Sequence, residues 1–477
     1  MAALSSPGRL LVVSAEVDAR LSGGDPRSAA AARERYESFL PLLRRWGDVV
    51  AVTHPESRLD FALWQAARQG HRPLHLSFLP LEQLYLSSEA PNVAFVDWGY
   101  PDLPGTMLGD DLRTNLSRTA RHLDAILASS SATRDALLRG GVRAPIAVLP
   151  PPLEDAAFAL PQPEPRVSTR LDGPARLFAG SAKAPDAPLG PWDRSSERGL
   201  VRVARRTYRM KIKPRLPEAL LRPIVRGVRG AEAAYRRRRA RPKTGGQAVG
   251  ALALAGVVYA CHLDPFDPAQ SWPDLLSAFL LALGDCSDAT LVVQIDTPPA
   301  EVAAGIARVA EVYRGLDVGH ACTLALQAGG RADVDALVRA STYVVGVGRT
   351  TGLCQPLRRF LAAGRPAIAP AHSLPSDDPA ALGFIVASSP EPAPWPAAPS
   401  QPCATRWHRL TWQSLHDQLR ASYRLATAAP ADYHRLADQA RAAMRGNASA
   451  EALWPRLVAA LDEVGVRPGG AIASAER

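Results

Sequence analysis

The segment from Gly348 to Pro370, GRTTGLCQPLRRFLAAGRPAIAP, has the residue types of an anion-binding loop. A strand ends at Gly348, a tight turn follows, and an amphipathic helix begins after Gly352 and ends at a second glycine. Gly352 lets the backbone approach a ligand, and the first N–H groups of the helix, near Leu353 and Cys354, point toward it. The segment therefore predicts a phosphate site, although every parallel sheet also contains turns of this kind.

Two stretches of the chain, residues 9 to about 150 and residues 251 onward, alternate apolar strands with helices. This alternation indicates parallel sheets covered by helices on both faces, with ligands at the carboxyl ends of the strands. We expect an α/β architecture of two doubly wound, Rossmann-like domains that face each other across a cleft. Their predicted bounds are residues 1–155 and 250–404, and residues 405–477 are predicted to form helices that pack back across both domains.

Between the two domains we expect an insertion, residues 156–249, that is first Pro-rich and then strongly basic. Its segment Arg198–Lys243 contains 17 Lys or Arg and 2 acidic residues, which accounts for the net charge of +10. Arginines interleaved with apolar residues such as Leu200 and Val203 predict an amphipathic helix that binds an anionic membrane surface. A solvated linker is the alternative. We do not expect nucleic acid as a partner, because no nucleic-acid-binding motif accompanies the patch.

Cysteine usage and hydropathy predict a cytoplasmic protein. The five cysteines form no CxxC pair, and the first apolar run, after Arg9, is too short for a secretion signal. No run reaches the roughly 18 to 20 apolar residues of a membrane span, so the basic segment would place the protein peripherally on the inner face of the membrane. No His or carboxylate cluster has metal-ligand spacing, and we expect neither a metal nor another cofactor.

Three motifs resemble those of the bacterial family 4 glycosyltransferases. Residues 264–279, DPFDPAQSWPDLLSAF, resemble NPxDGRKNWxDLLxAF, and residues 288–294, DATLVVQ, resemble DATLVLK. Residues 351–373, TGLCQPLRRFLAAGRPAIAPAHS, resemble EGQCLPLMEYLSAGKPAIAPxHT. The resemblance implies the GT-B fold and retaining chemistry without a metal. It also implies transfer of a hexose from a nucleotide sugar to a cell-surface glycan or a lipid-linked acceptor.

The resemblance further implies which positions bind the donor, and in this chain those positions have lost or reversed their charges. The family's Arg–Lys pair, which neutralises the leaving diphosphate, falls on Ala269 and Gln270. Its two glutamates fall on Thr351 and Arg359, and the lysine that ends the second motif is Gln294. Cations at a leaving group stabilise the transition state, so these replacements bear directly on the chemistry.

In the first domain the resemblance implies an acceptor side at the family's Trp–Glu pair, which is Trp98-Gly99 here. Asp97 and Trp98 are therefore the acceptor-side candidates. We expect Asp102 to serve the turn YPDLP, and His262, just before the cleft loop, to be a packed core residue.

Two interpretations stay open. The chain is a catalytically inactive homologue that acts as a scaffold or partner of an active glycosyltransferase, or it is an active enzyme with a rebuilt donor site. In the second case Arg349 replaces a lost cation, Arg359 meets a phosphate, and Arg358 and Arg365 lie close by in the sequence. Each lost charge-assisted hydrogen bond is worth roughly 1.5 to 3 kcal/mol, so the loss of two cations slows transfer by about 10² to 10⁴.

Overall fold

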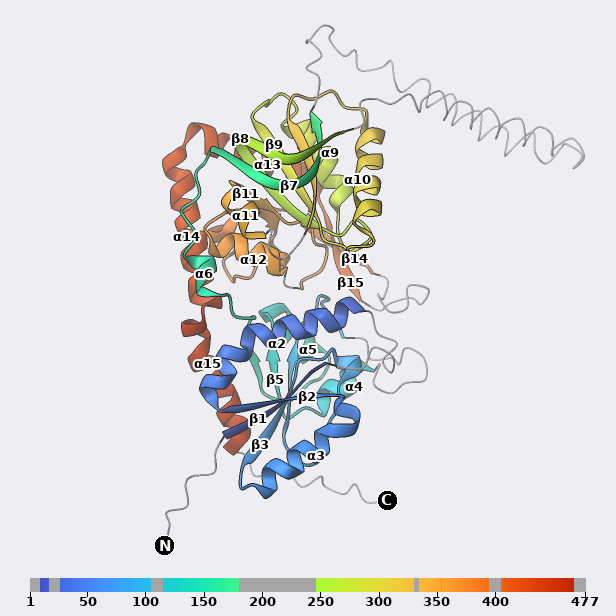
Figure 1. Ribbon diagram of the computed structural model, residues 1–477, viewed down its shortest axis with the longest axis vertical. Helices are drawn as coiled ribbons and strands as arrows, with labels where there is room; N and C mark the ends of the chain where they lie inside the picture. Colours follow the sequence, from blue (N-terminus) through green and yellow to red (C-terminus); the bar gives the residue numbers. More distant parts are fainter. Residues whose placement is uncertain are drawn as a thin grey trace, which may run out of the picture.

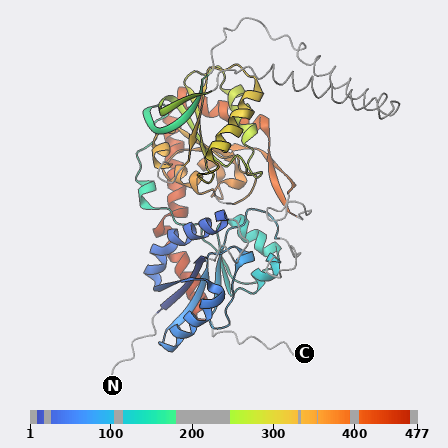
Figure 2. The ribbon, with the colours of Figure 1, turned by 45° about the vertical axis from the view of Figure 1, so that its right-hand side comes forward.

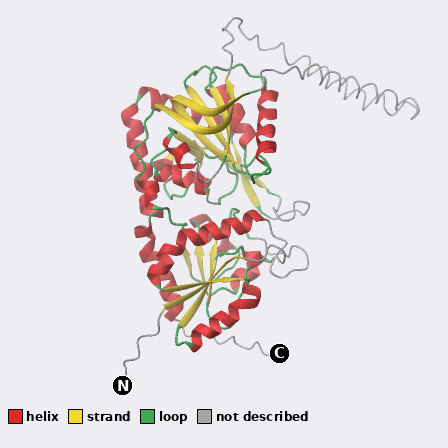
Figure 3. Ribbon diagram, in the orientation of Figure 1, coloured by secondary structure: helices red, strands yellow, loops and turns green. Residues whose placement is uncertain are grey.

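The computed structural model describes residues 9–16, 26–103, 115–179, 246–329, 334–352, 354–393 and 405–466. Within them the chain forms two α/β domains, one above the other in Figure 1, and the same division is visible after rotation (Figure 2). Helices flank the strands of each sheet (Figure 3). The basic segment Arg198–Lys243 and the loop residue Leu353 lie outside the described residues, so their predicted roles stay predictions.

The first domain is a parallel sheet of six strands in the order β2-β1-β3-β4-β5-β6. Successive residues of β1 face opposite sides: Leu11 and Val13 pack against one set of helices, and Leu10 and Val12 against α3. The elements are β1 (Arg9–Glu16), α2 (Pro26–Trp46), β2 (Asp48–Thr53), α3 (Pro55–Arg68), β3 (Arg72–Ser77), β4 (Asn92–Val96), α4 (Leu116–Arg121), β5 (Ala125–Ala128), α5 (Ser131–Arg139) and β6 (Ile146–Val148).

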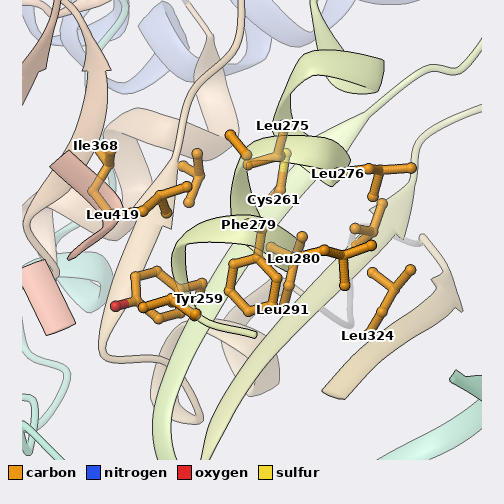
Figure 4. Close-up of a cluster of buried hydrophobic side chains, with 14 of the residues drawn as sticks. Tyr259, Cys261, Leu275, Leu276, Phe279, Leu280, Leu291, Leu324, Ile368 and Leu419 are labelled. Atoms are coloured by element: carbon orange, nitrogen blue, oxygen red, sulfur yellow. The ribbon is translucent and has the colours of Figure 1, made fainter. Parts of the chain in front are cut away.

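The second domain contains a sheet in the order β13-β12-β11-β8-β7-β10-β9, with β8 also paired to β9. Its parallel part packs against α9, α10 and α13 in a large apolar core, part of which appears in Figure 4 around Tyr259 and Phe279. The elements are β8 (Gln247–Leu263), α9 (Trp272–Ala282), β9 (Ala289–Ile295), α10 (Val302–Leu316), β10 (Thr323–Ala328), α11 (Val334–Arg339), β11 (Tyr343–Val345), α12 (Gln355–Ala362), β12 (Ala367–Pro370), β13 (Gly383–Val386) and α13 (Trp412–Ala428).

The predicted insertion contains a strand of the second domain. β7 (Val167–Ala179) pairs antiparallel with the first half of β8 and with β10, so the second sheet includes residues that we assigned to the insertion. Leu171, Ala175 and Phe178 are buried on it, but the Gly173-Pro174 bulge between them interrupts the alternation that marks a strand. β7 ends with Ala179 opposite Thr323, at the amino end of β10.

The Pro-rich end of the predicted second domain, from Ser388 onward, also contains a strand that the sequence did not indicate. β14 (Ser388–Pro392) pairs antiparallel with β15 (Arg406–Leu410), and the C-terminal helices begin only at Trp412. Proline is compatible with this two-stranded ribbon because an edge strand has N–H positions that need no partner. Ala393 and Trp407 of this hairpin pack in a core cluster of the first domain, so the hairpin contacts both domains.

Two neighbouring chain segments connect the domains. The first follows β6 and includes α6 (Asp155–Phe158), and the second is the junction of α14 (Pro430–Ala448) and α15 (Ala450–Val466). The Leu153 N–H donates to the Ala448 carbonyl at 2.9 Å, which joins the two segments. Figure 1 shows α14 beside the second domain and α15 beside the first. α15 fills the core of the first domain with Leu453, Leu457 and Leu461.

We expect Leu457→Ala to destabilise the first domain, although Leu457 belongs to the last helix of the chain. Leu457 is fully buried, and removing a buried leucine costs about 2 to 5 kcal/mol because a cavity is left. Urea unfolding followed by a first-domain tryptophan signal measures the loss. Ala459→Ser, at an exposed position of the same helix, should change stability by less than about 0.5 kcal/mol. Equal stability of Leu457→Ala and wild type would show that α15 is not part of the core.

Candidate functional site

A cavity of about 260 Å³ lies at the carboxyl end of the second sheet, where ligands of doubly wound domains bind. Its walls come from the loop after β8, the end of β11 and the beginning of α12. Several sequence-predicted donor positions line it, namely Ala269, Gln270, Gly352 and Cys354. The other lining residues are His262, Asp267, Val344, Val345, Gly346, Val347, Gly348, Thr350, Pro356, Leu357 and Ser373.

Backbone hydrogen bonds bring the two donor-side loops together. Gln270 and Gly348 form an antiparallel bridge, and the Arg349 N–H donates to the Ala269 carbonyl at 2.8 Å. The Asp267 carboxylate accepts from the Ala269 N–H at 2.8 Å and from the Gln270 amide at 3.1 Å. These hydrogen bonds join the two loops, and the positions of the family's Arg–Lys pair are uncharged.

The donor loop also contacts the first domain through a close approach of two glycines. The Thr351 N–H donates to the Gly99 carbonyl at 2.8 Å. A Cβ atom on Gly99 would lie 3.1 Å from the Thr350 Cβ and 3.4 Å from the Gly352 nitrogen. A side chain at position 99 would therefore require Thr350 to shift by a few tenths of an ångström. Thr351 is buried, and its Oγ1 has no hydrogen-bond partner among the described residues.

Polar side chains form a row across three neighbouring strands beside the cavity. His262 of β8 is paired in register with Gln294 of β9, and Gln294 with Gln327 of β10. Gln294 is fully buried, and neither its amide oxygen nor its nitrogen has a partner within the described part of the chain. The Nε2 atom of His262 also lacks one there. Burial lowers the pKa of His262 to about 4, against a smaller opposite effect of Gln294, so the imidazole is neutral at pH 7.

Arg349 and Arg359, the two candidate replacement cations, both pair with carboxylates. Arg349 forms an ion pair with Glu391, and its guanidinium carbon lies 4.0 Å from the centre of the Trp407 ring. Arg359 donates from Nε to Asp335 Oδ1 at 2.6 Å and from Nη2 to Oδ2 at 2.8 Å, a bidentate geometry. Their charges are therefore neutralised by side chains that do not line the cavity.

Arg358 and Arg365 instead hydrogen-bond the segment that connects the domains. Arg358 is 1% exposed and donates to the Pro151 carbonyl and to Gln355 Oε1. Arg365 is 2% exposed and donates to the Pro161 carbonyl at 2.8 Å. Burial lowers the pKa of Arg358 to about 10, with the Asp97 charge acting in the opposite direction, so Arg358 stays a cation at neutral pH. Both arginines connect domains rather than bind at the cavity.

The acceptor-side candidates lie in a hydrogen-bonded network of the first domain. Asp97 accepts from the Ser129 hydroxyl at 2.7 Å and from Arg35 at 3.3 Å. Trp98 is buried and donates from Nε1 to the Asp102 carbonyl at 3.1 Å. The Asp102 carboxylate lies 3.7 Å from Arg406 of β15, so this turn also contributes to the contact between domains.

Comparisons with known proteins rest on structure, because no family model and no curated protein matches the sequence. A glycosyltransferase from Rickettsia africae has a TM-score of 0.51 at 8% identity, with 97% of this chain and all of that chain covered. HepE of Anabaena, crystallised with UDP and glucose, has a TM-score of 0.47 at 12% identity, with 96% of this chain and all of that chain covered. Sucrose-phosphate synthase of Thermosynechococcus elongatus has a TM-score of 0.48 at 11% identity, with 95% of this chain and 98% of that chain covered.

The chain has the GT-B fold. This confirms the fold expected from the motifs. The cavity lies on the sheet edge of the second GT-B domain that faces the first. Ala269, Gln270 and Gly352 line this cavity, and their role in donor binding stays a prediction. The sequence contained no sign of the carboxylates that neutralise the arginines or of the close approach at Gly99. Such partners are distant in sequence, and no local pattern reports them.

The described residues of this GT-B chain include no helix long and apolar enough to cross a bilayer. Across the same residues, no group of three or more His, Cys, Asp or Glu side chains has an arrangement that could hold a metal ion.

His262 predicts a pH dependence of stability. Its pKa in the fold, about 4, is below the unfolded value of 6.5, so the stabilisation is present above pH 6.5 and is lost as the pH falls toward 4. When the pH falls from 6.5 to 5, we expect the free energy of unfolding of His262→Phe to decrease by about 2 kcal/mol less than that of wild type, because phenylalanine does not titrate. Urea unfolding at both pH values measures this. His122→Phe, at an exposed position, should retain the wild-type dependence. The same dependence in His262→Phe would contradict the assignment.

Proposed function

We propose that the protein is a non-catalytic homologue of the retaining family 4 glycosyltransferases, which supports an active glycosyltransferase and does not itself transfer a sugar from a nucleoside diphosphate. The motif resemblance supports the lineage. The observation that carries the proposal is the charge of the cavity: its described lining residues include no Lys or Arg, and Ala269 and Gln270 stand where the family has Arg and Lys.

A nucleoside diphosphate leaving group gains negative charge in the transition state, and catalysis requires donors or cations aimed at it. In this cavity no described lining residue is a cation, and His262 is neutral. The N–H groups of Arg349 and Thr351, which could face a phosphate in a loop of this type, donate to the Ala269 and Gly99 carbonyls instead. The described lining residues therefore offer no side-chain cation to the leaving group.

Movement of the nearby arginines does not remove this difficulty. Release of Arg359 breaks a bidentate pair with Asp335, and release of Arg349 breaks both its pair with Glu391 and its stacking on Trp407. Each would leave a half-buried carboxylate without its cation, so the gain at a phosphate is offset by the loss elsewhere.

An active hexosyltransferase with a rebuilt donor site is the second candidate, acting on a cell-surface glycan or a lipid-linked acceptor. The persistence of the cavity favours a site that still binds a ligand. For either candidate we propose a cytoplasmic location, with the basic segment Arg198–Lys243 on an anionic membrane surface.

We expect the wild-type protein to bind UDP and GDP weakly, and Ala269→Arg with Gln270→Lys to bind them at least about 10-fold more tightly, because two cations then face the diphosphate. Isothermal titration calorimetry measures the affinities, and Ala269→Met with Gln270→Met controls for side-chain size. Micromolar binding of a nucleoside diphosphate by wild type, or turnover of a nucleotide sugar, would refute the proposal.

Restoring the family glutamate at position 359 should destabilise the second domain. Arg359→Glu replaces the bidentate pair with two facing carboxylates, at a cost of about 1 to 2 kcal/mol for a partly exposed pair. The charge-reversed pair, Arg359→Glu with Asp335→Arg, should recover most of this loss. A double-mutant cycle in urea unfolding measures the coupling. No coupling between the two positions would mean that Arg359 is free to meet a ligand.

A further inference from the structure

The two chain segments that connect the domains lie on one side of the molecule. One includes α6 and the other is the junction of α14 and α15, and both are on the left in Figure 1. The β14–β15 hairpin lies on the right, at the level of the domain boundary, and it stays on that side after rotation (Figure 2). A rotation of the domains about their connections would separate them most at the hairpin, so contacts there resist opening most strongly.

One end of the hairpin is fixed in the second domain. Val386, which precedes β14, and Leu410, the last residue of β15, are buried in the large core of that domain. β15 is also bonded to the loop before α12, because the His408 N–H donates to the Arg349 carbonyl at 2.7 Å. The Arg349 side chain pairs with Glu391 of β14. The hairpin therefore moves with the second domain as one body.

The other end of the hairpin is buried in the first domain. Trp407 is 7% exposed, and Ala393, directly after β14, is 4% exposed. Both belong to the apolar cluster of the first domain that contains Trp98 and Tyr100. The Ala393 N–H donates to the Thr405 carbonyl at 3.1 Å, so the two strands remain paired as far as this cluster. Opening of the domains would have to pull both side chains out of it.

Trp407 supplies most of the resistance to opening. Its only polar atom, Nε1, donates to Glu391 Oε1 at 2.9 Å within the hairpin, so the ring enters the apolar cluster with its N–H already paired. Opening would expose this ring and its neighbours to water, which is unfavourable in proportion to the apolar area exposed. The ion pair of Arg406 with Asp102, at 3.7 Å, is largely exposed and contributes little.

We propose that the β14–β15 hairpin is a latch that holds the two domains closed on each other, with Trp407 as its anchor in the first domain. The hydrogen bond from the Thr351 N–H to the Gly99 carbonyl is a further contact of the closed state. The inference goes beyond the proposed function, because it concerns the movement of the domains and does not depend on what the cavity binds. A chain held closed in this way presents both domains to a partner as one surface.

Single-molecule fluorescence energy transfer in the full-length protein measures the opening. One dye is attached at Arg118→Cys in α4 and the other at Ala307→Cys in α10, both exposed positions, with Cys286, Cys354 and Cys403 replaced by serine. We expect the wild-type hairpin to give a single population of transfer efficiency. Trp407→Ala should raise the ratio of open to closed molecules by at least about 100-fold, because it removes a buried aromatic ring, and should add a population of lower efficiency.

Two further variants and a control connect the opening to the hairpin. Ala393→Asp puts a carboxylate into the same cluster from the other strand and should also open the molecule, because an unpaired buried charge is costly. Trp407→Phe keeps an aromatic ring and should stay mostly closed. Trp64→Ala, which removes an exposed tryptophan of α3, should leave the wild-type population unchanged. Circular dichroism and the thermal unfolding midpoint of each variant show whether it is folded.

The outcomes separate the latch from the proposed function. Two populations in the wild type, or an unchanged single population in folded Trp407→Ala, would overturn the latch and leave the non-catalytic assignment intact. A single wild-type population that divides in both Trp407→Ala and Ala393→Asp would support the latch. It would do so even if the protein bound UDP at micromolar concentration, which would refute only the non-catalytic assignment.

Discussion

The burial of the Arg358 guanidinium at the domain junction is the constraint on which this arrangement depends. A charge that is 1% exposed is costly unless its N–H groups are paired. Here Nη2 donates to Pro151 of the connecting segment and Nη1 to Gln355 of its own helix, whereas Nε has no partner among the described residues. The hydrogen bond to Pro151 fixes where the chain leaves the first domain. The helix that contains Arg358 is also the helix that begins at the cavity, so the cavity and the domain junction have one common rigid element.

The contacts between the domains explain the charges that the motifs have lost. Gly99 accepts from the Thr351 N–H, the β14–β15 hairpin holds Arg349 through Glu391 and Trp407, and Asp102 lies near Arg406. In a working GT-B enzyme the same surfaces must leave room for a donor between them. Here backbone and arginine contacts occupy them, and the buried apolar residues of the motif, such as Trp272 and Phe279, keep their role in the core. Packing and catalysis have separate requirements, and in our proposal this chain meets only the first.

The fold was largely predictable because its signals are local. Buried strands of the second domain are continuous apolar runs, as in Val257–Leu263, and the helices between them have proline near their first residue, as α9 and α12 do. β7 and the hairpin were missed because glycine and proline interrupt them, and their pairing depends on partners far along the chain. The site was predictable in position but not in charge balance: Asp335 and Glu391 are 24 and 42 residues from the arginines they neutralise.

The antiparallel strand β7 determines where the basic segment can act. It ends with Ala179 at the amino end of β10, and the chain re-enters at Gln247, which pairs with Leu177. The exit and entry points are therefore neighbours at the end of the second sheet opposite to the cavity. A surface that attracts this segment would contact the second domain at the end of its sheet that lies farthest from the cavity, so binding there would leave the cavity uncovered.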